Sequence, residues 1–274
     1  MLECVVNVSE GRCRSRVRAL ADAAGTSLLD LHVDPWHNRS VLTLAGARLI
    51  ADVRVLAEAT VALLDISQHT GVHPRIGVLD VVPFVPVATD GARGDLAEAI
   101  EARDDFAHWA GKALALPCFC YGPERSLPEI RHTAFHPLLP DAGPAEPHPS
   151  AGAACVGARS PLVAYNLWLA DRDLALARRV ASAIRGPAVR ALGLEVGSGV
   201  QVSCNLVSPL EVGPDEIYDA VDALATVDRA ELVGLVPRDV LHRAPAGHWP
   251  RLDLAEERTI EYRLADAGRA ARGG

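Results

Sequence analysis

The sequence has little lysine, methionine or aromatic character. Lys112 is its single lysine, it has one methionine, and aromatic residues make up 4% of the chain, so valine, leucine and alanine must fill any core. Nearly all positive charge is therefore arginine, and the formal net charge is −8 with a pI near 5.7. This acidic balance argues against nucleic acid or an anionic membrane as the main partner. A bound anion would need a local cluster of arginines.

Several sequence signals of other protein classes are also missing. The start of the chain lacks a basic segment followed by an apolar signal core, and no apolar run is long enough to span a membrane. The cysteines form no CxxC pair and mostly occupy apolar, strand-like runs; they are Cys4, Cys13, Cys118, Cys120, Cys155 and Cys204. Buried thiols in a reducing compartment explain them better than disulfides or zinc. We therefore expect a cytoplasmic protein.

Familiar catalytic motifs are absent as well. The chain has no GxSxG, no Walker loop, no GxGxxG after a strand and no HExxH. Its ten histidines show no ligand spacing with carboxylates on a helix face. We expect no metal site.

Hydrophobic periodicity indicates two similar halves. The second half alternates strand-like and helix-like segments in the order β-α-β-β-α-β, at residues 162–169, 172–185, 188–196, 200–207, 214–227 and 230–237. The first half shows the same order through residue 87. This order predicts an α+β protein with two ferredoxin-like subdomains, residues 1–158 and 159–274, packed around a ligand cleft.

Some local predictions are less regular. Residues 78–87 predict a strand whose prolines favour an edge position or an irregular end. Residues 134–152 contain five prolines and predict an extended linker or a binding loop. Ser9 is expected to cap the helix that follows it, and residues 252–264 to form a last amphipathic helix.

The most unusual stretch is "HTGVHPRIG", residues 69–77. It places two histidines and an arginine among turn-forming residues. Gly71 permits a turn and Pro74 fixes a dihedral angle beside His73, so His73 would be held in place. A histidine titrates near neutrality, and Arg75 can bind a carboxylate through two N–H groups. These residues are either solvated loop residues or a proton shuttle beside an anion-binding group.

Three further stretches collect polar side chains. "DPWHNRS", residues 34–40, offers imidazole, amide and guanidinium groups before a strand. "NVSEG", residues 7–11, stands at a strand-to-helix junction, where backbone N–H groups attract anions. Arg159 would lie where the two halves join, which is a usual place for a ligand cleft. Each has a simpler alternative. Residues 34–40 could be a solvated hairpin loop, residues 7–11 could be helix-capping residues, and Arg159 could form a structural salt bridge.

Eight stretches together carry a family resemblance. In order they are "ECVVNVSEG", "HNRSVLTLAG", "HTGVHPRIGVLDVVPFVPV", "YGPER", "PDAGP", "GARSPLVAYNLWL", "QVSCNL" and "LVGLVP". With them the chain resembles the formiminotransferase domain family. The resemblance implies two α/β subdomains around a ligand tunnel, a homodimer, and transfer of the formimidoyl group from N-formimidoyl-L-glutamate to N5 of tetrahydrofolate, its co-substrate. The products, 5-formimidoyltetrahydrofolate and L-glutamate, belong to histidine degradation.

The resemblance also implies roles for particular residues. His73 matches the catalytic histidine, as general acid and base. The expected substrate-binding residues are Asn7, His37, Asn38, Arg39, Arg75 and Asp80. The expected folate-binding residues are Ser150, Gly152, Gly157 and Arg159.

The chain departs from the family pattern at four positions. Val72 replaces a frequent glutamate, Ala151 replaces an aromatic residue of the folate loop, and Trp168 and His32 stand where small polar and acidic residues are usual. Two alternatives therefore stay open: a divergent folate-dependent formimidoyl or formyl transferase that acts on another amine, and a non-catalytic folate-binding relative.

Overall fold

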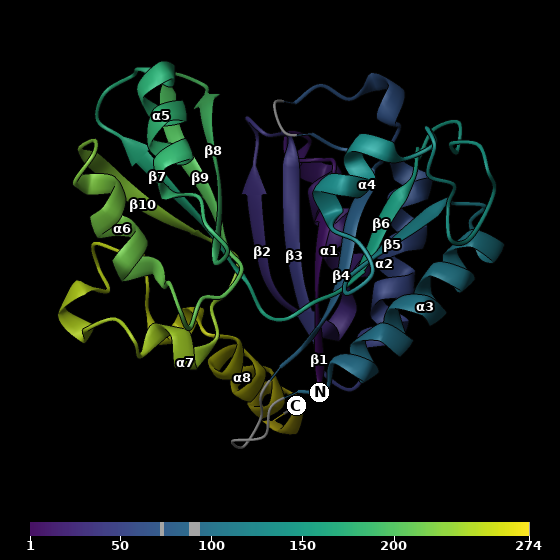
Figure 1. Cartoon of the computed structure of the whole chain (residues 1–274). Coiled ribbons are helices and arrows are strands. Elements are labelled where there is room, and N and C mark those ends of the chain that lie inside the picture. The colour runs from purple at the N-terminus through teal and green to yellow at the C-terminus, as the bar shows by residue number, and fades with distance from the viewer. Residues whose placement is uncertain (72–73, 88–93, 274) are drawn as a thin grey trace. The chain divides into compact units, whose positions relative to one another are not determined.

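The protein divides into two compact units, Met1–Ser160 and Pro161–Gly274, in a computed structural model that describes residues 1–71, 74–87 and 94–273. Each unit has its own sheet, of six strands in the first and four in the second. Figure 1 shows the helices and strands of both units. The units are described separately below.

The first unit begins with the predicted β-α-β-β-α-β order. Its elements are β1 (Leu2–Val8), α1 (Arg14–Ala23), β2 (Leu28–Asp34), β3 (Arg39–Ala45), α2 (Leu49–Leu63) and β4 (Leu79–Pro86), with 3-10 turns at Gly25–Ser27 and Ile66–Gln68. The strands pair in the order β2-β3-β1-β4, and neighbours run antiparallel. This is the ferredoxin-like arrangement, so the fold prediction is confirmed for this half.

Two further strands extend this sheet beyond the β-α-β-β-α-β elements. They are β5 (Cys118–Tyr121) and β6 (Ala154–Ala158), accompanied by α3 (Leu96–Ala113) and α4 (Leu127–Thr133). β6 lies between β4 and β5 and runs parallel to both. The edge position expected for β4 is wrong, because β4 lies between β1 and β6, but its pairing with β1 is irregular, with a register shift between Asn7 and Val8. The proline-rich segment 134–152 lies within the first unit, because β6 follows it in the same sheet, so the linker alternative is wrong for this segment.

Alternation along the strands places apolar side chains on both faces of this sheet. Cys4, Val6 and Val8 of β1 belong to a core that includes residues of α1, α2 and α3. Val81 of β4 belongs to a second cluster, with Phe119, Tyr121, Ile130, Ala153 and Cys155. In the second cluster Ile130 comes from α4, which is thereby fixed beside the strand that carries Asp80.

The second unit repeats the ferredoxin-like order. Its elements are β7 (Val163–Leu169), α5 (Leu174–Ile184), β8 (Val189–Val196), β9 (Gly199–Leu206), α6 (Pro214–Asp222) and β10 (Val227–Val233). The strand order is β10-β7-β9-β8 with antiparallel neighbours, as expected for this fold. The tail then forms α7 (Arg238–Leu241), 3-10 turns at Ala246–His248 and Glu256–Arg258, and α8 (Ile260–Gly273).

The last helix begins later than expected. Leu252 and Leu254 are buried in the core of the second unit, and Asp253 between them has φ +54°. The backbone oxygen of Leu252 also accepts a hydrogen bond from the Tyr165 hydroxyl at 2.8 Å. The left-handed conformation of Asp253 interrupts an α-helix at residues 252–254, and α8 starts at Ile260.

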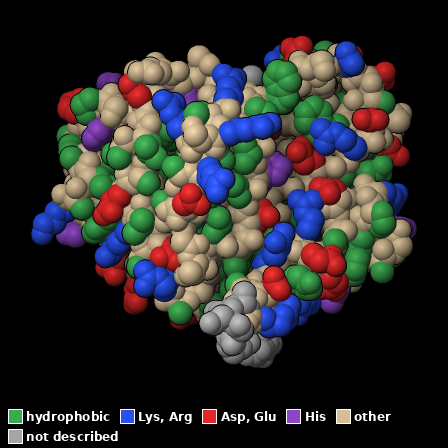
Figure 2. All heavy atoms as spheres, turned by 180° about the vertical axis from the view of Figure 1, so that it is seen from behind, with side chains coloured by type: hydrophobic (Ala, Val, Ile, Leu, Met, Phe, Trp, Pro, Cys, Tyr) green, Lys and Arg blue, Asp and Glu red, His purple; other side chains and the backbone are tan. Residues whose placement is uncertain are grey.

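The surface carries charges of both signs. On the face shown in Figure 2, arginine side chains lie close to aspartate and glutamate side chains. No helix within residues 1–71, 74–87 and 94–273 is both long and apolar enough to cross a membrane. All six cysteines are free thiols, and four of them are buried.

Candidate functional site

Asp80 is the centre of a buried polar cluster in the first unit. The residue is 1% exposed at the second position of β4. Its Oδ1 accepts the Ile76 N–H at 2.9 Å, and its Oδ2 accepts Nη1 of Arg39 at 3.2 Å and Nη2 of Arg131 at 2.7 Å. A buried carboxylate is stable only with such partners. Asp80 thus holds two guanidinium groups, from β3 and α4, at one point.

Arg39 connects this cluster to β1. Its Nε and Nη2 donate to Oδ1 of Asn7 at 3.0 and 2.7 Å. Burial lowers the pKa of Arg39 to about 10, because Asp80 only partly offsets the burial, and Arg131 and Arg75 lower the pKa further. Arg39 therefore still carries its charge at neutral pH.

Arg75 binds the backbone of the 34–40 loop. Its Nη2 donates to the His37 carbonyl oxygen at 2.8 Å and its Nη1 to the Asn38 carbonyl oxygen at 3.2 Å. Burial is the largest cause that lowers the pKa of Arg75, and Arg131 also lowers it. A Cβ added at Gly71 would stand 2.4 Å from the His37 oxygen and 2.7 Å from Nη2 of Arg75. Gly71 is therefore needed for this close approach.

His69 lies in contact with the same groups. Its Nε2 lies 2.7 Å from Nη1 of Arg75 and 2.9 Å from the Asn38 carbonyl oxygen. Burial lowers the pKa of His69. The hydrogen bond to the Asn38 carbonyl raises the pKa, and the positive charge of Arg75 lowers it further, so that the net change is a decrease.

Asn38 joins three segments of chain. It has φ +49°, a left-handed conformation that asparagine tolerates better than most residues. Its Oδ1 accepts the Gly11 N–H and its Nδ2 donates to the Thr70 carbonyl oxygen, both at 3.0 Å. Arg12 braces the same turn, because its Nε donates to the Pro35 carbonyl oxygen and its Nη1 to the Thr70 hydroxyl.

His37 is oriented by Asp34. The backbone N–H groups of Trp36 and His37 donate to Oδ1 of Asp34 at 2.7 and 2.8 Å, and Nδ1 of His37 contacts Oδ2. Burial alone would raise the pKa of Asp34, but the hydrogen bonds from His37 and Trp36 lower it below its usual value. The turn before β3 is therefore a compact Asx turn.

Ser9 does not cap helix α1. Its hydroxyl donates instead to the Gly77 carbonyl oxygen at 2.8 Å, and α1 begins at Arg14 after an N-cap residue, Cys13, without a side-chain hydrogen bond. Glu10 binds this turn, because its Oε1 accepts the N–H groups of Arg12 and Cys13 at 2.9 Å each. The expectation that Ser9 caps the helix is wrong because the turn joins Ser9 to the start of β4.

The expected folate loop packs against the segment before β4. Gly77 pairs with Gly152, and the Ser150 carbonyl oxygen accepts the Ile66 N–H at 2.7 Å. Gly152 has φ +71°, and a Cβ there would stand 2.4 Å from the Ile76 carbonyl oxygen. Ala151 is fully buried, and its carbonyl oxygen accepts a hydrogen bond from the Val78 N–H at 2.9 Å, so the two segments meet through their backbones. Ser150 and Gly152 thus lie next to the segment that ends at Asp80.

Gly157 lies farther along β6, and Arg159 directly follows the last residue of that strand, Ala158. The register pairs Val81 with Cys155, so Arg159 is five positions beyond the residue opposite Asp80, roughly 16 Å in the strand direction. A Cβ at Gly157 would stand 2.1 Å from the Tyr121 ring. Burial raises the pKa of Tyr121 to about 12, which Arg159 partly opposes. The four expected folate-binding residues therefore form two separate groups.

The six expected substrate-binding residues form two hydrogen-bonded groups that meet at the adjacent residues Asn38 and Arg39. Asn7, Arg39 and Asp80 are linked by side-chain hydrogen bonds, and the Arg75 side chain donates to the carbonyl oxygens of His37 and Asn38. The positive charge of Arg75 also lowers the pKa of Arg39. His73 and Val72 lie outside the described residues. Arg131 was not predicted, because its helix carries no motif.

Trp168, on β7 of the second unit, contacts one acidic and one basic side chain. The indole Nε1 of Trp168 donates to Oε2 of Glu231 at 2.9 Å, and the Arg229 guanidinium lies 4.2 Å above the ring.

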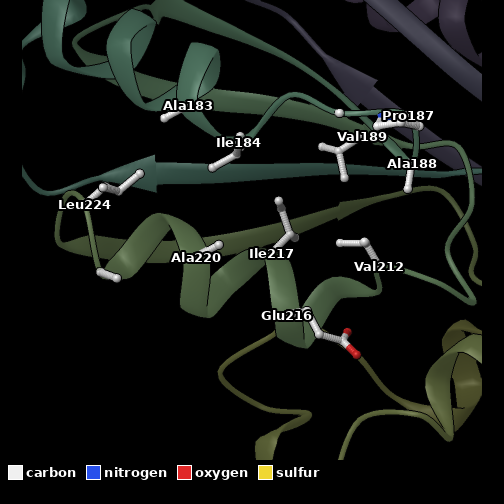
Figure 3. A pocket seen from close by; sticks show the side chains of 12 residues that line it. Ala183, Ile184, Pro187, Ala188, Val189, Val212, Glu216, Ile217, Ala220 and Leu224 are labelled. Atoms are coloured by element: carbon white, nitrogen blue, oxygen red, sulfur yellow. The ribbon is translucent and has the colours of Figure 1, made fainter.

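An open groove of about 440 Å³ in the second unit lies between α5 and α6 and is lined mainly by apolar side chains such as Ile217 (Figure 3). Its one charged lining residue, Glu216, accepts hydrogen bonds from Gly213 and Arg243. Such a wall does not suit a carboxylate-bearing ligand.

Within the described part of the chain, no group of three or more histidine, cysteine, aspartate or glutamate side chains could hold a metal ion.

Known proteins resemble the chain over nearly its whole length. The family described as "Formiminotransferase domain, N-terminal subdomain" matches residues 1–159. The glutamate formimidoyltransferase of Streptococcus pyogenes serotype M1 is 32% identical over 93% of this chain and 92% of its own length. That of Thermoplasma acidophilum is 32% identical over 88% and 89%. The formimidoyltransferase-cyclodeaminase of Gallus gallus is 34% identical over 88% of this chain and 51% of its own length.

Proposed function

The chain belongs to the formiminotransferase family, and from that premise we propose that it transfers the formimidoyl group of N-formimidoyl-L-glutamate to N5 of tetrahydrofolate. The products are 5-formimidoyltetrahydrofolate and L-glutamate, as in histidine degradation. The single observation that supports this proposal most is the arginine-rich cluster around Asp80, which follows directly on the segment of His73. An acidic protein has here the local positive charge that anionic substrates need.

The reaction needs one group that accepts and then donates a proton. N5 of the folate attacks the amidine carbon, and the tetrahedral intermediate carries nitrogen atoms on both sides. N5 then loses a proton, the glutamate nitrogen gains one, and the bond between the amidine carbon and that nitrogen breaks. We assign both transfers to His73, because an imidazole titrates near neutral pH; such help is typically worth about 10²–10⁴-fold in rate.

The described residues supply binding and orientation. Arg39 and Arg75 bring positive charge, and Asn38 fixes the turn that precedes His73 through its bond to Thr70. A rigid turn keeps the reacting groups aligned, which can contribute more to the rate than proton transfer. Ser150, Gly152, Gly157 and Arg159 remain our proposed folate contacts. Ser150 and Gly152 are the better supported pair, because they pack beside the Asp80 segment.

A His73→Ala variant tests the assignment. We expect transfer to fall by at least about 10²-fold while the melting temperature and the calorimetric affinity for tetrahydrofolate stay near those of the unmodified protein. His108→Ala, at an exposed position on α3, is the matched control and should turn over normally. Unchanged turnover in His73→Ala would refute the proposed mechanism.

We also propose that the protein works as a homodimer in the cytoplasm. The free, mostly buried cysteines support a reducing compartment, and the dimer follows from the family resemblance.

A further inference from the structure

Arg131 of α4 is a member of the cluster that sequence reasoning did not assign. Its Nη2 donates to Oδ2 of Asp80, and its side chain is 19% exposed. Its Nε is buried and has no hydrogen-bond partner within the described residues. An arginine has five N–H donors, and a buried donor without an acceptor is costly. The guanidinium is therefore fixed at one end and incompletely satisfied.

A second arginine near α4, Arg125, forms a bidentate pair with one carboxylate. Arg125 donates from Nη1 to Oδ2 and from Nη2 to Oδ1 of Asp141, at 3.0 and 2.9 Å. Asp141 is thus bound by both ends of one guanidinium group. Asp80 instead gives a single oxygen to Arg131 and shares that oxygen with Arg39. Within the described residues Arg131 thus uses one terminal nitrogen, whereas Arg125 uses both for a single carboxylate, so Arg131 keeps an open side for a second carboxylate.

We propose that Arg131 binds a carboxylate of the formimidoyl donor and that Asp80 orients it for that purpose. This inference rests on the proposed function. The donor is favoured over folate by the position of the reacting atoms. In N-formimidoyl-L-glutamate the amidine nitrogen sits on Cα, so the α-carboxylate carbon is two bonds from the leaving nitrogen. In tetrahydrofolate the glutamate carboxylates lie beyond the p-aminobenzoyl group, far from N5.

The hydrogen bond from the Ile76 N–H to Asp80 connects Arg131, through Asp80, to a residue that follows His73 by three positions in the sequence. The proposed contact places the donor's carboxylate at Arg131 and directs its leaving nitrogen toward this segment. Ile130, the neighbour of Arg131, is fully buried in the second core cluster, so α4 is a firm support for the guanidinium group.

Steady-state kinetics of Arg131→Gln and Arg131→Lys test the proposal, with Arg125→Gln as the matched control. We expect the KM for N-formimidoyl-L-glutamate to rise about 10- to 100-fold in Arg131→Gln, the range for loss of a charge-assisted hydrogen bond. The KM for tetrahydrofolate should change less than threefold, and Arg131→Lys should be intermediate. Arg125→Gln should leave both KM values unchanged. Melting temperatures would show that each variant is folded.

Calorimetry separates failure of this inference from failure of the proposed function. L-Glutamate, the product, carries the same two carboxylates and binds without turnover. Weaker glutamate binding in Arg131→Gln than in Arg125→Gln supports the inference even if the unmodified protein transfers no formimidoyl group. Equal donor KM and equal glutamate affinity in the two variants would overturn it, as would absence of glutamate binding to the unmodified protein.

Discussion

Asp80 carries one negative charge between two guanidinium groups, and removal of that charge should cost far more than removal of a surface charge. In Asp80→Asn the Ile76 N–H keeps an acceptor, but Arg39 and Arg131 lose their counter-ion. We expect the free energy of unfolding to fall by about 3–5 kcal/mol, as for other broken buried pairs. Urea unfolding measures this.

The control for that experiment is Asp104→Asn. Asp104 pairs with Arg103 at 2.8 Å, but its side chain is 56% exposed, so the loss should stay within about 1 kcal/mol. Equal losses in Asp80→Asn and Asp104→Asn would contradict a structural role for the buried cluster.

His69 should make stability depend on pH in a defined direction. Burial and Arg75 lower its pKa in the folded protein below the unfolded value near 6.5. The unfolded state therefore binds the proton more readily, so this contribution to stability is complete above pH 6.5 and is lost as pH falls through the folded pKa. Unfolding free energies measured between pH 7.5 and 5.5 should decline.

The variant His69→Gln should show a smaller decline over that range, whereas His108→Gln, at an exposed position on α3, should follow the unmodified protein. Asp34 and Glu10, whose folded pKa values are also lowered, act only nearer pH 4, where stability should fall again. An unaltered pH slope in His69→Gln would argue against the contacts described for this ring.

At the scale of elements, the contact between the start of β4 and residues 150–153 should tolerate no added side chain. A Cβ at Gly77 would stand 2.1 Å from the Ala153 carbonyl oxygen and 2.5 Å from that of Ala151. Both atoms are backbone, so the two segments would have to separate. We expect Gly77→Ala to lower the free energy of unfolding by about 1–3 kcal/mol, and therefore to lower the midpoint temperature of thermal unfolding.

Gly186→Ala provides the control, because a Cβ there meets nothing within 4 Å. Its effect should be small or slightly stabilising. If Gly77→Ala were as well tolerated as Gly186→Ala, Gly77 would not be required for the close approach of these segments.

The elements also show which features of the sequence carry structural information. Periodicity over β7, α5 and α6 identifies these elements, because each buries one regular face. β6 was not predicted as a strand, because "ACVGA" is short and made largely of small residues, and its place depends on pairing with two strands distant in sequence. The interior position of β4 depends on the same pairing.

In the candidate site, too, the local polar loops could be predicted from the sequence, but the contacts between them could not. The polar loops were visible because histidine, asparagine and arginine cluster in the sequence at residues 34–40 and 69–77. Their connection through Asn38 and Asp80 is tertiary and has no local signal. Arg131 was missed for that reason, since a single arginine in a short helix resembles a surface charge until its partner is known.

At the scale of the whole molecule, the two units, each with a ferredoxin-like order of elements, account for the full chain together with their added strands and helices, and the family relationship extends across both. The relatives from Streptococcus pyogenes and Thermoplasma acidophilum are each matched over about nine-tenths of their length. Both units are therefore expected to be needed for transfer.

The most direct test of the central claim is a two-substrate turnover assay with the purified full chain. Tetrahydrofolate and N-formimidoyl-L-glutamate are supplied together and singly, and 5-formimidoyltetrahydrofolate and free L-glutamate are both quantified. We expect the two products in equal amounts, and only when both substrates are present. Absence of 5-formimidoyltetrahydrofolate from a folded protein that binds tetrahydrofolate would contradict the account.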